Sequence, residues 1–142
     1  MARRRYSFDE AKIARYHKEG RGKGHGAEYV PWIKVGDVPS RGRSHRLNGV
    51  KTGRLHHLLS DNEANLFRLL DWCDDVTDIR EQFPLDREAT RRIAEQLGIR
   101  HPHDTVTQTP LVMTTDVLVD VVRDGRKVTL ARTVKPHDEL DN

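Results

Sequence analysis

Alternating β-branched residues on both sides of an Asp-Gly pair predict a β-hairpin in the last third of the chain. The two alternating runs are Thr115–Val122 and Lys127–Lys135, and Asp124 and Gly125 lie between them. An Asp-Gly pair in this setting is the strongest short-range signal for a two-residue hairpin turn. The turn would place Arg123 opposite Arg126.

That register gives the hairpin two chemically different faces. Asp116 would lie opposite Thr133, and Lys135 would project from the same face two residues further on. The other face is apolar except for Arg132, so we expect it to join the core. Its members are Val117, Val119, Val121, Val128, Leu130 and Val134.

The remaining pattern predicts helices and strands in alternation, separated by Gly and Pro. The expected elements are a helix that Ser7 and Glu10 cap and that stops at Gly20, an extended segment over Tyr29–Val38, a hairpin with strands near Ser44–Leu47 and Arg54–Leu58, a helix from Asp61 to about Trp72 capped by Ser60, a strand over Val76–Phe83, a helix over Asp86–Leu97 closed by Gly98, and a loop over His101–Pro110.

Composition limits what these elements can build. With 142 residues the chain is one domain or a fragment of a larger protein, and 35% hydrophobic against 33% charged residues predicts a modest core. No run resembles a membrane span or a signal peptide. The lone Cys73 excludes an internal disulfide and fits a reducing cytosol, and we interpret it as a small buried hydrophobe.

Charge is distributed unevenly along the chain. Residues 1–57 hold 14 Lys and Arg against 5 Asp and Glu, a balance of +9, whereas residues 58–142 hold 11 against 17, a balance of −6. A basic arm before an acidic module suits a protein whose first part holds phosphates and whose second part holds metal. The alternative is a solvated basic tail.

Two segments of the arm favour phosphate contacts. The glycine-rich stretch G-R-G-K-G-H-G at 20–26 would let backbone amides approach a phosphate, or would be a flexible linker, and R-G-R-S-H-R at 41–46 is densely basic. The candidate DNA contacts are Gly22, Lys23, Gly24, Arg41, Arg43, Arg46 and Arg54.

Glu63, Asp116 and Lys135 are the candidate catalytic residues. Carboxylates hold the Mg²⁺ ions that activate water and neutralise a leaving oxygen in phosphodiester hydrolysis. A nearby lysine can orient or deprotonate the water. Competing interpretations remain for each: Glu63 would close a capping box begun by Ser60, and Asp116 with Lys135 would form an exposed ion pair.

Histidine pairs offer a weaker metal hypothesis. His56-His57 and His101-x-His103 lack a cysteine pair or an H-E-x-x-H pattern, so we interpret them as loop or DNA-facing residues rather than transition-metal ligands.

Eight stretches, taken in order, resemble the N-terminal catalytic domain of the TnsA family, the endonuclease subunits of heteromeric transposases. They are E-G-R-G-K-G-H-G, Y-V-P-W, S-R-G-R-S-H-R, K-T-G-R-L-H-H-L-L-S-D, D-I-R-E-Q-F-P-L, G-I-R-H-P, M-T-T-D-V-L-V-D and V-K-P. The resemblance implies an α+β, restriction-endonuclease-like fold with a mixed sheet and antiparallel hairpins flanked by helices.

The resemblance also implies a function. Family members cleave the 5′ ends of a transposon in double-stranded DNA with Mg²⁺, for which Mn²⁺ can substitute, in the bacterial cytoplasm. A partner transposase, TnsB, acts on the 3′ ends, and an ATPase regulator, TnsC, joins the complex. By position, the family's catalytic Glu corresponds to Glu63, its metal-binding Asp to Asp116 and its lysine to Lys135.

Two departures from the family bear on activity. Thr133 stands where the family usually has Gln, although a backbone carbonyl there would still reach a metal. The chain also stops at Asn142, before the elements that complete the family's nuclease fold and its C-terminal domain. We therefore expect a basic arm and hairpin over 1–57 packed on an incomplete catalytic core over 58–142. The alternatives are a catalytically impaired DNA-binding or assembly module and a solvated domain without DNA affinity.

Overall fold

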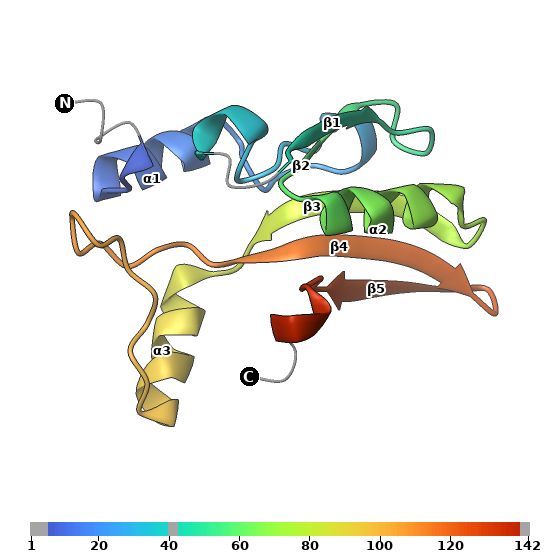
Figure 1. Ribbon diagram of the computed structural model, residues 1–142. Coiled ribbons are helices and arrows are strands. Elements are labelled where there is room, and N and C mark those ends of the chain that lie inside the picture. Colours follow the sequence, from blue (N-terminus) through green and yellow to red (C-terminus); the bar gives the residue numbers. More distant parts are fainter. Residues whose placement is uncertain (1–5, 40–42, 140–142) are drawn as a thin grey trace.

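A computed structural model describes residues 6–39 and 43–139 (Figure 1). Its helices and strands are α1 (Glu10–Lys18), β1 (His45–Asn48), β2 (Leu55–Leu58), α2 (Asp61–Trp72), β3 (Val76–Pro84), α3 (Arg87–Leu97), β4 (Thr114–Arg123) and β5 (Arg126–Arg132), with short 3-10 turns η2 (Gly26–Glu28), η3 (Val35–Asp37) and η4 (His137–Glu139). No described helix has the length and apolar character needed to cross a membrane.

Strands β3, β4 and β5 form an antiparallel sheet with β4 in the centre. The predicted turn is confirmed: Asp124 and Gly125 have φ of 51° and 74°, and Arg123 pairs with Arg126. Positive φ at both central residues is what a type I′ turn requires. The predicted register is confirmed as well, because Val117 pairs with Arg132.

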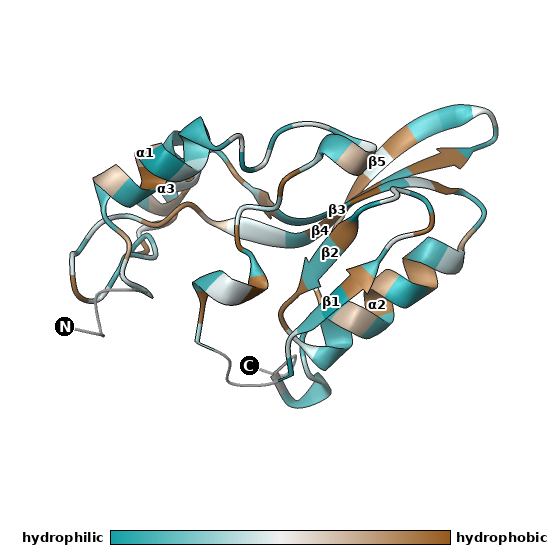
Figure 2. Ribbon diagram, turned by 90° about the horizontal axis from the view of Figure 1, so that it is seen from above, coloured by the Kyte–Doolittle hydropathy of each residue, from teal (hydrophilic) through white to brown (hydrophobic). Residues whose placement is uncertain are grey.

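The main core lies between α2 and the sheet, and the β1–β2 hairpin packs beside α2 and β3 (Figure 1). Apolar residues occur along the strands and on α2 (Figure 2). Burying the shared apolar surface is the main force holding these elements together. The buried members are Leu58, Ala64, Phe67, Val76, Ile79, Val117, Val119 and Val121.

A second apolar cluster holds the N-terminal segment in place. Ile13 and Tyr16 on α1 pack with Trp32, which is only 1% exposed, and the aromatic rings of Tyr16 and Trp32 meet edge to face at 5.2 Å. Val112, just before β4, packs against the same cluster. The N-terminal segment is therefore anchored to the sheet region by aromatic contacts.

The predicted α+β architecture of antiparallel hairpins flanked by helices is confirmed. Every strand pairing among the described residues is antiparallel, so the parallel pairing that a mixed sheet needs does not occur there. The helix predicted from Asp61 to Trp72 has the expected Ser60 cap, and the helix over 87–97 closes at Gly98 in the left-handed conformation.

Four local predictions were wrong. The first helix is capped by Asp9, whose side chain accepts from the Lys12 amide, rather than by Ser7. The extended 29–38 segment contains the turn η3. Cys73 is exposed because it follows the last turn of α2. Strand β5 ends at Arg132, three residues earlier than expected.

The apolar face of the hairpin is only partly buried. Val117, Val119 and Val121 on the central strand β4 are buried, whereas Val128 on β5 is 37% exposed. The difference follows from position, since β5 is an edge strand of the described sheet and has one neighbour fewer.

Candidate metal and catalytic site

The first turn of α2 positions Glu63. The Ser60 hydroxyl accepts from the Glu63 amide at 3.1 Å, which starts the helix, and the Glu63 carboxylate accepts from the Leu59 amide at 2.8 Å. In a capping box, the Glu side chain accepts from the backbone amide of the N-cap residue, which here is Ser60. The Glu63 carboxylate instead accepts from the amide of Leu59, one residue earlier. The Leu59 bond occupies one carboxylate oxygen of Glu63, so capping and metal binding are compatible.

Strand β4 positions Asp116. One of its carboxylate oxygens accepts from the Val134 amide at 2.8 Å. This bond explains why the β4–β5 ladder stops at Arg132, because the Val134 amide pairs with a side chain instead of the strand, and Pro136 shortly after has no amide to donate. The segment that carries Thr133 and Lys135 is thereby anchored to Asp116.

Glu63 and Asp116 line one small cavity between α2 and the sheet. Its volume is about 10 Å³, close to what one water molecule needs. Glu81 from β3 is a third carboxylate in the lining, and the other walls are apolar. The lining residues are Leu58, Glu63, Leu66, Phe67, Leu70, Ile79, Glu81, Asp116 and Val117.

The two candidate carboxylates repel each other. Burial raises the pKa of Glu63, the charge of Asp116 raises it further, and hydrogen bonds from the Leu59 amide and the Gln82 side chain oppose the rise. Like charges held close together in apolar surroundings disfavour joint ionisation. A divalent cation would remove that penalty, and carboxylate oxygens are the ligands that Mg²⁺ and Mn²⁺ prefer, so Glu63 and Asp116 fit such an ion.

Thr133 and Lys135 lie outside the strand and are exposed. Among residues 6–39 and 43–139, no hydrogen bond or ion pair joins Lys135 to Asp116. The fold thus brings Glu63 and Asp116 to one cavity. Lys135 is connected to that cavity only because the neighbouring Val134 amide donates to Asp116.

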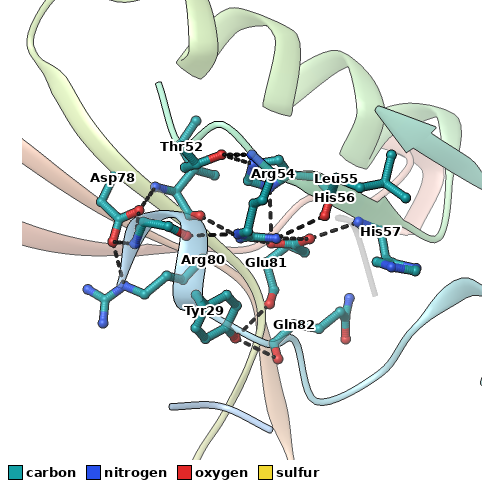
Figure 3. A network of polar contacts seen from close by, with 12 residues as sticks. Tyr29, Thr52, Arg54, Leu55, His56, His57, Asp78, Arg80, Glu81 and Gln82 are labelled. Atoms are coloured by element: carbon teal, nitrogen blue, oxygen red, sulfur yellow. Dashed lines mark hydrogen bonds and ion pairs between the residues drawn. The ribbon is translucent and has the colours of Figure 1, made fainter. Parts of the chain in front are cut away.

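Beneath the cavity, Glu81 is the centre of a buried polar network (Figure 3). Arg54 donates to both carboxylate oxygens, the His57 amide donates at 2.7 Å, and the His56 ring lies 3.1 Å away. Thr52 holds the other ring nitrogen of His56 at 2.7 Å. The network joins the β1–β2 hairpin to β3 directly below the candidate site.

The environment of Glu81 favours its charged form. Burial by itself raises the pKa, but the hydrogen bonds and charges of His56 and Arg54 outweigh burial and lower the pKa to about 2. Since these partners already saturate its carboxylate, Glu81 supports the site and is not itself free to hold an ion. Sequence reasoning missed this role, because the predicted strand over 76–83 also carries Asp78, Arg80 and Gln82 and does not indicate which of its polar residues is buried.

The structure assigns Arg54 to this network rather than to DNA. Its side chain is 8% exposed, and besides Glu81 it donates to the carbonyls of Ile79 and Gly26. A guanidinium with these partners is not available to a phosphate, so the expected Arg54 contact is corrected.

The glycine-rich stretch is a packed turn and not a flexible linker. The Gly22 amide donates to the Val30 carbonyl at 2.6 Å, and a Cβ on Gly22 would lie 2.2 Å from Pro84. The Gly26 amide binds the Asp78 carboxylate at 3.1 and 3.2 Å. These two amides therefore serve acceptors of the protein itself. Gly24, with φ of +87°, is needed because a side chain there would crowd the Glu28 carbonyl.

Lys23, Arg43 and Arg46 are exposed and accessible to a phosphate backbone. Arg43 lies 3.8 Å from Asp61 at the start of α2, which puts it near the helix end that carries Glu63. Arg41 lies outside the described residues. The DNA-contact hypothesis thus retains three exposed side chains among the described residues, and Arg43 is the one that lies near the candidate site.

The histidines have protein partners. The imidazole of His57 accepts from the Val35 amide at 3.1 Å, and His101 bonds to the Thr90 hydroxyl at 2.7 Å. A different group, His25, Asp78 and Asp120, has ligand atoms within 4.8 Å of one another. The guanidinium of Arg80 is bound to Asp120 at 2.9 Å and lies 3.6 Å from Asp78, so this cluster already holds a cation of its own.

Fold and site together define a class: an α+β domain of antiparallel hairpins and flanking helices, with a helix carboxylate and a strand carboxylate facing one cavity. The family model described as TnsA-like endonuclease N terminal matches residues 73–142. The Transposon Tn7 transposition protein TnsA of Escherichia coli is 53% identical over 142 residues, which are 100% of this chain and 51% of that protein. The chain is thus similar to the TnsA-like endonuclease N-terminal family, and it spans about half the length of this curated relative.

Proposed function

We propose that this chain is the metal-dependent DNA endonuclease part of a heteromeric transposase and that it cleaves the 5′ ends of a transposon during cut-and-paste transposition. The observation that carries the proposal is the meeting of Glu63 and Asp116 at one cavity, in a chain 53% identical to a transposition protein. Two carboxylates that repel each other in apolar surroundings suit a divalent cation better than any other role for the pair.

Glu63 and Asp116 would hold Mg²⁺, or Mn²⁺ in its place, through the oxygens that the Leu59 and Val134 amides leave free. The bound ion supplies the activated water and neutralises charge on the leaving oxygen. Thr133 would contribute its backbone carbonyl, because a threonine hydroxyl is a poorer ligand than the Gln usual in the family. Lys135, on a segment anchored to Asp116, would orient the attacking water and balance developing charge.

The basic surface would hold DNA. Lys23, Arg43 and Arg46 contact backbone phosphates in this proposal, together with Arg41, and residues 1–57 act as an arm on the catalytic core of residues 58–142. Partners resembling TnsB and TnsC would supply end recognition and regulation. Because the similar protein comes from Escherichia coli, we also propose the bacterial cytoplasm as the compartment.

The test is strand cleavage of a transposon-end duplex with Mg²⁺ and the cognate partner transposase. We expect nicking at the 5′ end by the unaltered chain, and loss of nicking with Asp116→Ala. Asp74→Ala removes the same charge from an exposed position after α2 and should nick normally. Cleavage that persists in Asp116→Ala would contradict the proposed site.

A second candidate function is a DNA-binding or assembly module without catalysis. The exposed Lys135 and the presence of Thr133 favour it, since both weaken the case for a complete catalytic set. A folded chain that binds DNA with no divalent dependence and no nicking would support this alternative.

A further inference from the structure

The C-terminal end of α2, which lies beside β1 (Figure 2), carries an exposed tryptophan. Trp72 is 87% exposed, and so is Val50 on the turn between β1 and β2. Both side chains line a groove of about 390 Å³, and buried Phe67 belongs to the same lining. Exposed apolar side chains that gather around a hollow mark an interaction site, unlike apolar residues scattered singly over a surface. We call this hollow the Trp72 groove, and its lining residues are Leu47, Asn48, Val50, Phe67, Arg68, Asp71 and Trp72.

Hydrogen bonds hold the Trp72 groove in shape. The Asp71 carboxylate accepts from the amides of Val50 at 3.0 Å and Lys51 at 3.2 Å, which fixes the β1–β2 turn against α2. Within the turn, the Gly49 amide donates to the Arg54 carbonyl at 2.9 Å. Because the groove exists before a partner arrives, binding there requires little ordering of this chain.

The Trp72 ring has no ring or cation partner in the part of the chain that the structure describes. Other aromatic side chains do have such partners: the Tyr16 ring meets the Trp32 ring at 5.2 Å, and the Arg21 guanidinium lies 3.6 Å from the Tyr16 ring centre. Among aromatic side chains, tryptophan offers the best face to a guanidinium or ammonium group. The open face of Trp72 therefore suits an arginine or lysine of another molecule.

Charge at this end of α2 also favours a cation. Asp71 lines the groove, and Asp74 and Asp75 follow as exposed residues, with no Lys or Arg from position 69 to position 75. The C-terminal end of a helix adds partial negative charge. Lys51 and Arg68 offset only part of this charge. The balance disfavours DNA phosphates and a second copy of the same acidic surface, and it favours a positively charged segment.

We infer that the Trp72 groove is a docking site for a segment of a partner protein that carries an arginine or lysine beside an apolar side chain. The apolar side chain enters the groove over Phe67, and the cation stacks on Trp72 in the acidic surroundings. Tryptophan and arginine are among the residues that dominate the energetics of protein interfaces. Trp72 follows Glu63 by nine positions on one helix, a distance of about 14 Å, so docking leaves the candidate metal site open.

A library of random short peptides displayed on phage supplies the probe. The library is selected on the unaltered chain, with an excess of the Trp72→Ala variant as competitor. We expect enriched peptides to carry an arginine or lysine close in sequence to a large apolar residue. The chain holds two tryptophans, so the NMR signals of the indole N–H groups report the site. The Trp72 signal should shift with an enriched peptide, and the signal of buried Trp32 should not.

Calorimetric titration with an enriched peptide measures the contribution of each group. Trp72→Ala should bind about tenfold more weakly or worse. Val50→Ser should also bind more weakly, whereas Leu97→Ala is the matched control, because Leu97 is 66% exposed on α3 and outside the groove. Replacing the peptide's arginine by citrulline, or its lysine by norleucine, removes the charge and should weaken binding about threefold or more.

Several results would overturn the inference. They are enriched peptides that lack a cation, no peptide whose affinity depends on Trp72, and equal affinity of the charged and uncharged peptides. Self-association or duplex binding that Trp72→Ala abolishes would identify a second copy or DNA as the occupant instead. Trp72 and Val50 are exposed, so neither replacement removes a core contact. Equal thermal midpoints of the variants and the unaltered chain verify that the fold is retained.

Discussion

Glu63 and Glu81 border the same cavity, and their surroundings shift their pKa values in opposite directions. Glu81 has Arg54, His56 and a backbone amide as partners, so its charge is compensated. Glu63 faces Asp116 and has two neutral donors, so its negative charge is not compensated. Compensation of charge therefore distinguishes Glu81, which supports the fold, from Glu63, which we propose as a metal ligand.

Replacing Glu63 by Gln should stabilise the metal-free chain at neutral pH. A pKa raised in the folded state means that stability is full below pH 4.5 and is lost as the pH rises through the folded pKa. Gln cannot ionise, so that loss disappears. The measurement is the thermal midpoint in chelator at pH 7.5, where Glu63→Gln should melt higher.

Added Mn²⁺ should reverse the order, because the unaltered chain gains binding free energy that the variant lacks. A Glu63→Gln midpoint below that of the unaltered chain in chelator would contradict the repulsion between Glu63 and Asp116.

Glu81 should make the chain sensitive to acid in a defined range. A pKa lowered from 4.5 to about 2 gives stability that is present above pH 4.5 and lost as the pH falls through 2. The loss amounts to about 3 kcal/mol. Urea unfolding at a series of pH values would measure it, and Glu81→Gln should flatten the slope between pH 4.5 and 2.

Glu95→Gln is the matched control, because Glu95 is exposed on α3. An equal acid slope in Glu81→Gln and the unaltered chain would show that other carboxylates account for acid sensitivity.

At the scale of elements, the 20–26 turn is part of the packed fold. Gly20 and Gly22 have nearly equal φ, +78° and +82°, but only Gly22 lies against Pro84 at the end of β3. A side chain would therefore cause the same backbone strain at both positions, but only at Gly22 would it clash with Pro84.

Gly22→Ala should consequently destabilise the chain more than Gly20→Ala. The difference should be about 1–3 kcal/mol, the usual cost of forcing an extra carbon into packed surroundings. Chemical denaturation of the two variants measures it. Equal losses would mean that the turn moves away from Pro84 freely, as a linker does.

The β4–β5 hairpin illustrates how far local pattern extends. The Asp-Gly pair specifies the turn and hence the register of every residue up to Arg132. The end of β5 was not predictable, because it depends on a side chain of β4 capturing the Val134 amide. The acceptor, Asp116, lies on the neighbouring strand β4, so this contact depends on the tertiary structure and not on the periodicity of the sequence.

For the whole molecule, the distribution of exposed cations predicts how DNA binding depends on salt. Arg46→Gln should lower affinity for duplexes of any sequence and reduce the slope of log affinity against log salt by about 1, since one phosphate contact is lost. Fluorescence anisotropy over a salt series measures the slope.

Arg92→Gln removes the same charge from α3, which projects away from the sheet (Figure 1), and should leave the slope unchanged. Equal slopes for the unaltered chain and Arg46→Gln would remove β1 from the proposed DNA surface.

The sequence alone determined most of the secondary structure, the two hairpins, the Ser60 cap and the resemblance to the TnsA family, because each depends on near neighbours or on a long ordered match. It also indicated Glu63 and Asp116. Only the tertiary structure decided which cations are exposed and which are structural: Arg46 and Arg54 both belong to a basic arm, yet Arg54 is enclosed by Glu81 and backbone carbonyls. Burial and hydrogen-bond partners depend on residues distant in sequence, which local pattern does not encode.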